Sequence, residues 1–167
     1  MKVLLVRHAK AESRPRRGSL HQGDERRRLT PGGRKDMAKA AKGLKRLVPV
    51  IDVLATSPLV RARETAEILA RRYDRDDIAD VAALSPGGEP RVLVEWLRGQ
   101  RKGALIALVG HEPDLGGFAG YLLTGRRETF LPLKKGGACL IDFADGPVAG
   151  RGRLEWLLPP NALRKLA

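Results

Sequence analysis

The sequence predicts an α/β fold, a three-layer α/β/α sandwich around a largely parallel central sheet. The first observation is that short apolar runs alternate along the chain with longer segments that repeat apolar residues every three or four positions. The second is that two of the longer segments open with Ser or Thr followed by Pro, at 30–31 and 57–58, which is typical of a helix start. A length of 167 residues suits one domain, so we expect residues 1–167 to form a single domain.

The first third of the chain supplies a strand, a loop and a helix. Lys2–Arg7 is rich in Val and Leu and predicts a short, buried parallel strand. Residues 9–29 are polar and basic and predict a long loop, and such loops in compact domains are usually functional or disordered. Thr30 then caps a helix that has Pro31 at its first position and ends before Pro49. The apolar face of this helix is expected to consist of Met37, Ala40, Ala41, Leu44 and Leu47.

The middle of the chain repeats this pattern of strand and helix. Residues 50–56 predict a second strand, and Ser57-Pro58 begins a helix with the same cap-then-proline signal. A third helix is expected over residues 90–100. The expected core-facing residues are Leu59, Ala62, Ala66, Leu69 and Tyr73 in the helix after Pro58, and Val92, Leu93, Trp96 and Leu97 in the third helix.

The last third begins with the strongest strand signal, Ala104–Val109, which leads almost directly to His111. The helix that follows is expected to bury Leu115, Phe118, Ala119 and Leu122. Residues 138–143 and 153–158 predict two closing strands joined by a turn at 146–152, and the tail predicts a short helix.

The composition excludes several classes of protein. Cys139 is the single cysteine, so an intramolecular disulfide and a cysteine-rich metal site are both excluded. Because Cys139 lies in a predicted strand, we interpret it as a buried thiol. The apolar run Val3–Val6 is too short for the core of a signal peptide, and no segment approaches the length of a membrane span. We therefore expect a cytoplasmic protein that has no membrane partner.

The charge raises the question of a polyanion partner. The chain carries 32 Lys and Arg against 19 acids, a formal net charge of +13. Six arginines crowd the long loop, and they are Arg14, Arg16, Arg17, Arg26, Arg27 and Arg28. We favour a solvated loop, because no aromatic residues are interleaved there to stack bases and no nucleic-acid-binding motif is present. A nucleic-acid partner is not expected, and a basic polyanion-binding protein remains the non-enzyme alternative. His21 also lies in this loop, outside any motif, and is expected to be a bystander.

Unusual polar residues follow three of the predicted strands. Arg7 and His8 close the first strand, Arg61 lies within one turn of the second strand's end, and His111 follows the central strand. Ligands of open α/β sheets bind outside the carboxyl ends of the strands. Two of the three histidines in the chain stand at such an end, so we expect these side chains to meet in one site.

Two histidines and two arginines without neighbouring metal ligands suit phosphoryl transfer. Arg guanidinium groups bind phosphate through paired hydrogen bonds, so Arg7 and Arg61 can neutralise the phosphate oxygens. A neutral imidazole can attack phosphorus and carry it covalently, which is the role expected of His8. His111 is expected to donate a hydrogen bond to a non-bridging oxygen. The helix after Ser57-Pro58 would point its N-terminus toward the same anion.

Three stretches in this order resemble the histidine phosphatase superfamily, whose fold is called phosphoglycerate-mutase-like. They are residues Leu5–Lys10, Ser57–Thr65 and Val109–Pro113. Within the superfamily the chain is most similar to the short SixA-like phosphohistidine phosphatases. The resemblance implies that His8 is the phosphorylated nucleophile and that the phosphate pocket also contains Arg7, Arg61 and His111. It further implies that the enzyme needs neither a metal nor an organic cofactor.

The sequence departs from the family at the general acid. Larger members place a Glu after the third strand to protonate an alkoxide, and Glu89 is the candidate here, although it is equally explained as an acid at the start of the third helix. A weak acid suits the labile P–N bond of phosphohistidine. The resemblance therefore favours a phosphorylated protein as partner, such as a phosphorelay carrier. The alternative is a phosphatase for small phosphate esters.

Overall fold

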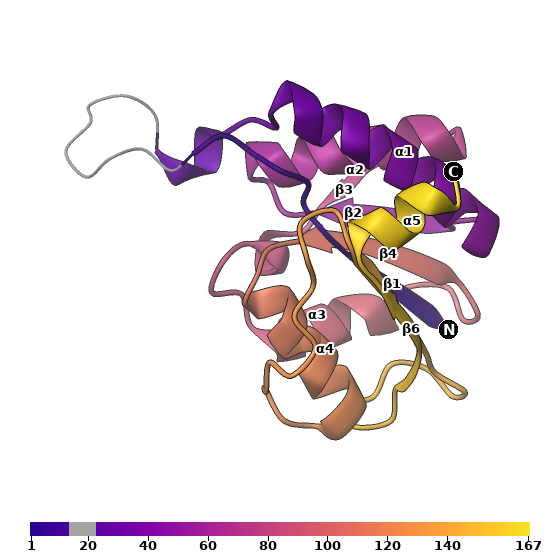
Figure 1. The fold of residues 1–167 in the computed structure, drawn as a ribbon. Helices are drawn as coiled ribbons and strands as arrows, with labels where there is room; N and C mark the ends of the chain where they lie inside the picture. The colour runs from indigo at the N-terminus through magenta and orange to yellow at the C-terminus, as the bar shows by residue number, and fades with distance from the viewer. Residues whose placement is uncertain (14–22) are drawn as a thin grey trace.

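The sheet of this protein is mixed, with its parallel part carrying the predicted site. The computed structural model describes residues 1–13 and 23–167. Its strands lie in the order β3-β2-β4-β1-β5-β6 (Figure 1). The pairs β3–β2, β2–β4 and β4–β1 are parallel, whereas β1–β5 and β5–β6 are antiparallel. The strands are β1 Lys2–Arg7, β2 Val53–Thr56, β3 Ala79–Asp80, β4 Leu105–Gly110, β5 Ala138–Asp142 and β6 Arg153–Leu158.

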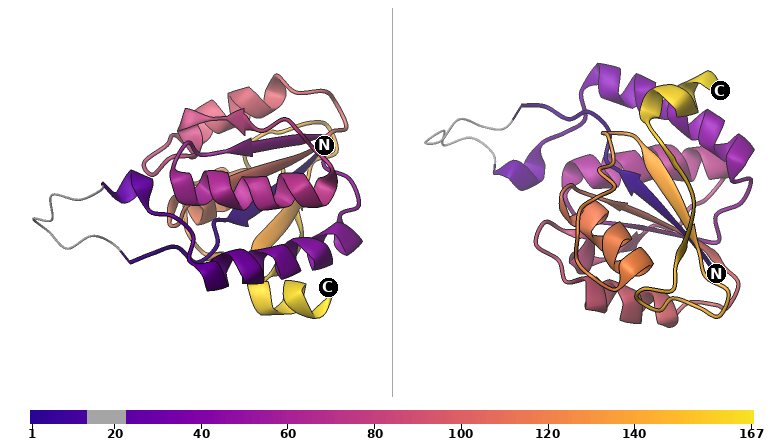
Figure 2. Two further views of the ribbon diagram at one scale, coloured as in Figure 1. Left: turned by 90° about the horizontal axis from the view of Figure 1, so that it is seen from above. Right: turned by 60° about the horizontal axis from the view of Figure 1, so that its bottom comes forward.

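Helices cover both faces of the sheet and complete the three layers, which confirms the predicted fold class. Buried residues form one apolar cluster between the sheet and α1, α2 and α5, and a second cluster between the sheet and α3 and α4. Figures 1 and 2 show the same two groups of helices on opposite sides of the strands. The helices are α1 Pro31–Leu47, α2 Val60–Tyr73, α3 Pro90–Arg98, α4 Asp114–Thr124 and α5 Pro160–Lys165, with short 3-10 turns η1 Asp24–Arg26 and η2 Ala82–Leu84.

The first helix begins as its sequence predicts. The Thr30 hydroxyl accepts a hydrogen bond from the Gly33 amide at 3.0 Å, which satisfies one of the free N–H groups of the first turn. Gly43 lies against the backbone carbonyl of Leu163, so only a residue without Cβ lets α5 pack this closely on α1. The prediction that Leu47 is buried is wrong, because the buried face ends at Leu44 and Leu47 lies 40% exposed in the last turn.

The second helix begins later than predicted. Its N-cap residue is Leu59, so the cap-then-proline interpretation of Ser57-Pro58 is wrong. The reason is that Ser57 extends the pairing of β2 with β4 by one residue, since its amide donates to the Val109 carbonyl at 3.0 Å. Its hydroxyl accepts from the Leu59 amide at 3.3 Å and is available to a second partner described below.

Smaller differences concern the sheet edge and the third helix. The two exposed residues of β3 carry no apolar signal, and the sequence does not predict this strand. Val92 is 55% exposed, whereas Val94 is buried in its place, so the predicted face of the third helix is rotated. Cys139 is buried, and this burial raises the pKa of its thiol to about 12, as expected of an inert core cysteine. Within the described ranges, no helix has both the length and the apolar character needed to cross a bilayer.

Candidate active site

The sheet register brings the ends of β1, β2 and β4 together. Arg7 pairs with Gly110 across β1 and β4, and Thr56 pairs with Val109 across β2 and β4. The His8 amide then donates to the Gly110 carbonyl at 3.0 Å, which extends the ladder one residue beyond β1. The predicted site residues therefore emerge at one edge, the carboxyl edge of the parallel strands, where ligands bind in such sheets.

The two histidine rings face each other, and both are buried. Their ring centroids are 5.1 Å apart and the rings are tilted by 52°, with His8 5% and His111 3% exposed. His8 Nδ1 lies 2.7 Å from the carbonyl oxygen of Ala9. A carbonyl only accepts hydrogen bonds, so this contact assigns the hydrogen to Nδ1 and leaves Nε2 with a lone pair. The backbone at Ala9 thus selects the tautomer in which Nε2 is nucleophilic.

The Ser57 hydroxyl fixes the second histidine. His111 Nε2 lies 2.9 Å from Ser57 Oγ, which already accepts from the Leu59 amide. The Ser57 hydroxyl can donate to His111 Nε2, and in that tautomer the ring hydrogen of His111 lies on Nδ1. His111 Nδ1 is buried and has no hydrogen-bond partner among the described residues. With its hydrogen on Nδ1, His111 would offer a buried donor to an anion that enters the site.

Both imidazoles are held neutral. Burial lowers the pKa of His8 to about 4, opposed by its bond to the Ala9 carbonyl and assisted by the charges of Arg61, Arg7 and Lys135. Burial also lowers the pKa of His111 to about 3, with Arg61 as the strongest neighbouring charge. These effects place two guanidinium groups and one ammonium within electrostatic reach of His8. A neutral imidazole among cations is what an attack on a phosphate group requires.

We expect His8 to titrate near pH 4 and His111 near pH 3. The NMR signals of the histidine rings, recorded as a function of pH, measure both values. The lowered pKa means that both rings stay neutral between pH 5 and pH 8, because protonation begins only well below neutrality. The unfolded chain protonates these rings first, so the free energy of unfolding should fall as the pH drops from about 6.5 toward about 4. A midpoint near 6.5 for His8, assigned by loss of its signal in His8→Ala, would contradict this arrangement.

Arg61 is a buried cation with a fixed partner. It lies in the first turn of α2 and is 3% exposed. Its Nη1 donates to the Asp24 carbonyl at 2.6 Å, and its Nη2 donates to the Asp24 carboxylate at 2.9 Å. A buried guanidinium needs such a partner, and this pair fastens η1 over the edge of the site. Arg63 differs, because it is partly exposed and pairs with Asp80 at 2.8 Å on the outside of the molecule.

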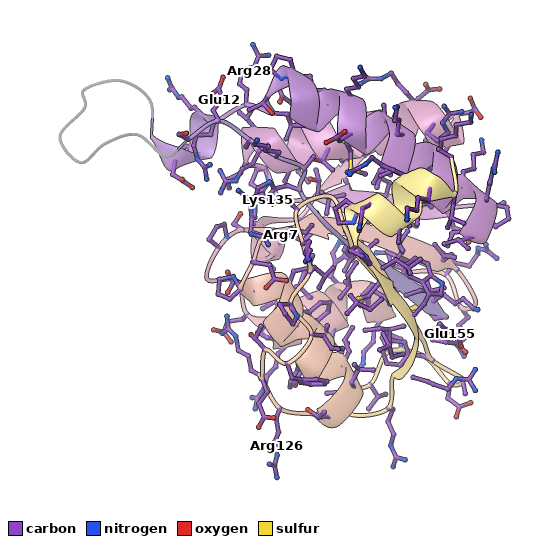
Figure 3. The ribbon with its side chains drawn as sticks, viewed as in Figure 1. Arg7, Glu12, Arg28, Arg126, Lys135 and Glu155 are labelled. Carbon is purple, nitrogen blue, oxygen red and sulfur yellow. The ribbon has the colours of Figure 1, made fainter. Side chains whose placement is uncertain are left out.

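Arg7 and Glu112 hold the segment before β5 from two sides. Arg7 Nη1 donates to the Leu133 carbonyl at 2.7 Å, and the Leu133 amide donates to Glu112 Oε1 at 2.8 Å. Burial lowers the pKa of the Arg7 guanidinium, while the charge of Glu112 acts in the opposite direction. Burial also raises the pKa of Glu112 above its usual range. Figure 3 shows Arg7 together with Lys135 at this end of the sheet.

Two side chains of α2 connect the parts of the site. The Thr65 hydroxyl accepts from the Ala9 amide at 3.1 Å and donates to the Arg61 carbonyl at 2.7 Å. Glu64 Oε2 accepts from the Leu29 amide at 2.7 Å, and its other oxygen pairs with Arg28 at 3.0 Å. Burial alone would raise the pKa of Glu64, but the bonds from Leu29, Arg34 and Arg28 lower it, so the carboxylate stays ionised. The chain on both sides of residues 14–22 is thereby fastened to the site.

The structure brings His8, Arg7, Arg61 and His111 together, and it places Glu89 elsewhere. Glu89 occupies the N-cap position of α3, is exposed, makes no capping bond with its side chain and accepts from Arg127 at 3.5 Å. Among the described residues, the Glu89 side chain thus forms neither a capping hydrogen bond nor a hydrogen bond with His8 or His111. His21 and the arginines of residues 14–17 lie outside the described residues. In the described part of the chain, no group of three His, Cys, Asp or Glu side chains is arranged to hold a metal ion.

Sequence reasoning missed Asp24, Glu112 and Lys135. Glu112 and Lys135 carry a signal, because Glu112 follows His111 directly and Lys135 precedes the Gly pair that leads into β5. Asp24 carries no comparable signal. It sits in a polar loop, and only the fold brings it to Arg61.

Comparison with known proteins gives the class of fold first and then the family. The chain is a phosphoglycerate-mutase-like α/β protein, with a TM-score of 0.81 to the protein histidine phosphatase SixA complexed with tungstate, over 98% of this chain and 99% of that chain. The family model of the histidine phosphatase superfamily (branch 1) matches residues 3–84. An uncharacterized protein of Picosynechococcus sp. is 34% identical over 139 residues, 82% of each chain. The chain belongs to the histidine phosphatase superfamily, which makes it a phosphatase by class.

Other structures share the fold at low sequence identity. The SixA structure is 23% identical to this chain. A phosphoserine phosphatase mutant from Entamoeba histolytica, in complex with phosphoserine, has a TM-score of 0.68 at 16% identity over 93% of this chain and 95% of that chain. A mycobacterial glucosyl-3-phosphoglycerate phosphatase has a TM-score of 0.66 at 16% identity over 92% and 96%. At these identities the likeness establishes the fold, including its similarity to SixA, and leaves the substrate open.

Proposed function

We propose that this chain, acting as one domain over residues 1–167, hydrolyses phosphohistidine on a partner protein through a covalent phosphate on His8. The observation that carries the proposal is the neutral His8 ring, fixed through Nδ1 by the Ala9 carbonyl, opposite His111 and within reach of two arginine charges. A neutral, nucleophilic imidazole among these cations supports transfer of the phosphate to His8 followed by hydrolysis.

The reaction has two balanced steps. His8 Nε2 attacks phosphorus, a new N–P bond forms as the substrate N–P bond breaks, and the departing imidazole takes up a proton from solvent. Water then attacks the phosphorus on His8, the N–P bond breaks, and inorganic phosphate leaves with the remaining proton going to solvent. Arg7 and Arg61 neutralise the phosphate oxygens in both steps, and His111 Nδ1 donates to one of them. No step calls for a metal or an organic cofactor.

The character of the leaving group supports a protein phosphohistidine. Imidazole is a good leaving group, so its departure requires less from a proton donor than the departure of an alkoxide. The Glu89 carboxylate, which is the family-based candidate for that donor, pairs with Arg127 on the exposed start of α3. One of the similar structures is itself described as a protein histidine phosphatase.

One observation favours a second candidate, the hydrolysis of small phosphate esters. Glu112 is a partly buried carboxyl group beside Arg7, and its raised pKa suits a proton donor to an alkoxide. Two of the similar structures are phosphatases of small phosphate compounds by their own descriptions.

Turnover of matched substrates distinguishes the two. We expect kcat/KM for a histidine-phosphorylated carrier protein to exceed that for a panel of sugar, nucleotide and aryl phosphates by at least about a hundredfold. Glu112→Gln should leave the phosphohistidine rate nearly unchanged. A panel ester preferred by a large factor, with a rate that collapses in Glu112→Gln, would replace the first candidate by the second.

A further inference from the structure

We infer that the groove between α1 and α2 binds an acidic segment of a partner protein. The identification of that partner with the phosphorylated substrate rests on the proposed function, whereas the binding site itself does not. The groove involves none of the four residues of the candidate site, and its lining consists of Arg34, Lys35, Ala38, Ile68, Arg71 and Arg72.

The two helices form the walls of the groove. Figures 1 and 2 show α1 and α2 side by side on the same face of the sheet. Lys45 joins their far ends through the Asp74 carboxylate at 3.0 Å, and the Tyr73 hydroxyl donates to the Val48 carbonyl at 2.9 Å. The open space between their outer faces has a volume of about 530 Å³.

The charge of the groove is of one sign. Four of its six lining residues are cations and none is an acid. Arg34 is held in place by Glu64, which lies below it. Across residues 1–13 and 23–167, no ion pair is formed by Lys35, Arg71 or Arg72. A groove in which three of the four cations form no ion pair with a described residue favours an anionic occupant.

The apolar part of the lining favours a polypeptide over a nucleic acid. Two of the lining residues, Ala38 and Ile68, are apolar, so an acidic segment with an occasional apolar side chain would match both features. The lining contains no aromatic residue on which a base could stack. We therefore assign the groove to a segment rich in Asp and Glu.

The groove is also connected to the candidate site. Glu64, the partner of Arg34, receives the Leu29 amide and pairs with Arg28 at the end of the loop that carries Asp24. A partner bound in the groove would hold its phosphorylated residue near this edge of the sheet and raise its effective concentration there.

Binding of a labelled peptide of about ten residues, with Glu at most positions and Leu at every third, tests the proposal by fluorescence anisotropy on the full chain. We expect Lys35→Glu combined with Arg71→Glu to weaken binding at least about tenfold. The matched control combines Arg91→Glu with Arg126→Glu, which changes the net charge equally on the α3 and α4 side of the sheet. Figure 3 shows Arg126 far from α1 and α2, and both control residues are exposed. The control should weaken binding by no more than about twofold.

Three results would overturn the proposal. One is an equal loss of peptide binding in both double variants, which would show attraction by net charge alone. The second is stronger competition for the groove by a single-stranded oligonucleotide of similar length than by the unlabelled peptide. The third is unchanged peptide binding in the groove variant. Melting temperature and turnover of an aryl phosphate verify that both variants fold, and the peptide result stands even if phosphohistidine proves not to be the substrate.

Discussion

Replacement of His8 by alanine is expected to reduce turnover by at least about 10⁴-fold and to abolish covalent phosphate on the protein. The reason is that Nε2 of His8 is the atom on which the phosphate rests between the two steps. The other residues of the site still bind and neutralise phosphate, but none of them provides a neutral ring fixed in this tautomer at the end of β1.

Rapid mixing with substrate and an alkaline quench measures this directly. Wild-type protein should retain phosphate that is stable to base and labile to acid, and His8→Ala should retain none. His21→Ala is the matched control, because the sequence predicts a bystander at that position, and it should behave as wild type. Covalent phosphate on His8→Ala, or turnover close to that of wild type, would show that the proposed nucleophile is wrong.

Replacement of Arg61 by alanine is expected to lower kcat/KM by about 10²- to 10³-fold, with both kcat and KM affected. The guanidinium is nine-tenths or more buried and sits within electrostatic reach of both histidines. Its loss removes a donor to the phosphate and also breaks the ion pair with Asp24, whose carboxylate then still contacts Arg27. Arg61→Lys should recover only part of the loss, because an ammonium does not reproduce the planar fork.

Arg63→Ala is the control for this prediction. Arg63 lies two residues further along the same helix, pairs with Asp80 and Glu67 on the outside, and should change kcat/KM by no more than about twofold. Steady-state kinetics with one aryl phosphate compare the two variants under identical conditions. Equal losses in Arg61→Ala and Arg63→Ala would show that α2 contributes structure rather than a phosphate ligand.

The fold could be predicted largely because its elements have clear periods. The Val and Leu run of β1 and the capped start of α1 each agree with their local sequence, and the structure places both as expected. The exposed edge strand β3 could not be found this way, because its two residues, Ala79 and Asp80, are too few to show a period. The start of α2 could not be predicted from the Ser-Pro signal, because Ser57 bonds to β4 and to His111 and the helix begins only after Leu59.

The candidate site also contains residues that the sequence predicts and residues that it does not. His8 and His111 could be selected because each follows an apolar strand, and parallel strands end at one edge of the sheet. The partners of these residues could not be selected. Asp24 reaches Arg61 from 37 residues away in the sequence, a contact that no local pattern encodes. Glu89 is only the acid nearest to the family's proton-donor position, and its side chain pairs with Arg127 on the surface, so its role remains a prediction.

The Thr65 hydroxyl, bonded to both the Ala9 amide and the Arg61 carbonyl, has a consequence for protein engineering. One oxygen atom sets the spacing between the nucleophile's loop and the helix that carries the phosphate arginine. A mutant library aimed at new phosphorylated substrates should therefore keep Thr65 constant. Variation belongs instead at exposed positions such as Glu89, whose carboxylate lies on the surface at the start of α3.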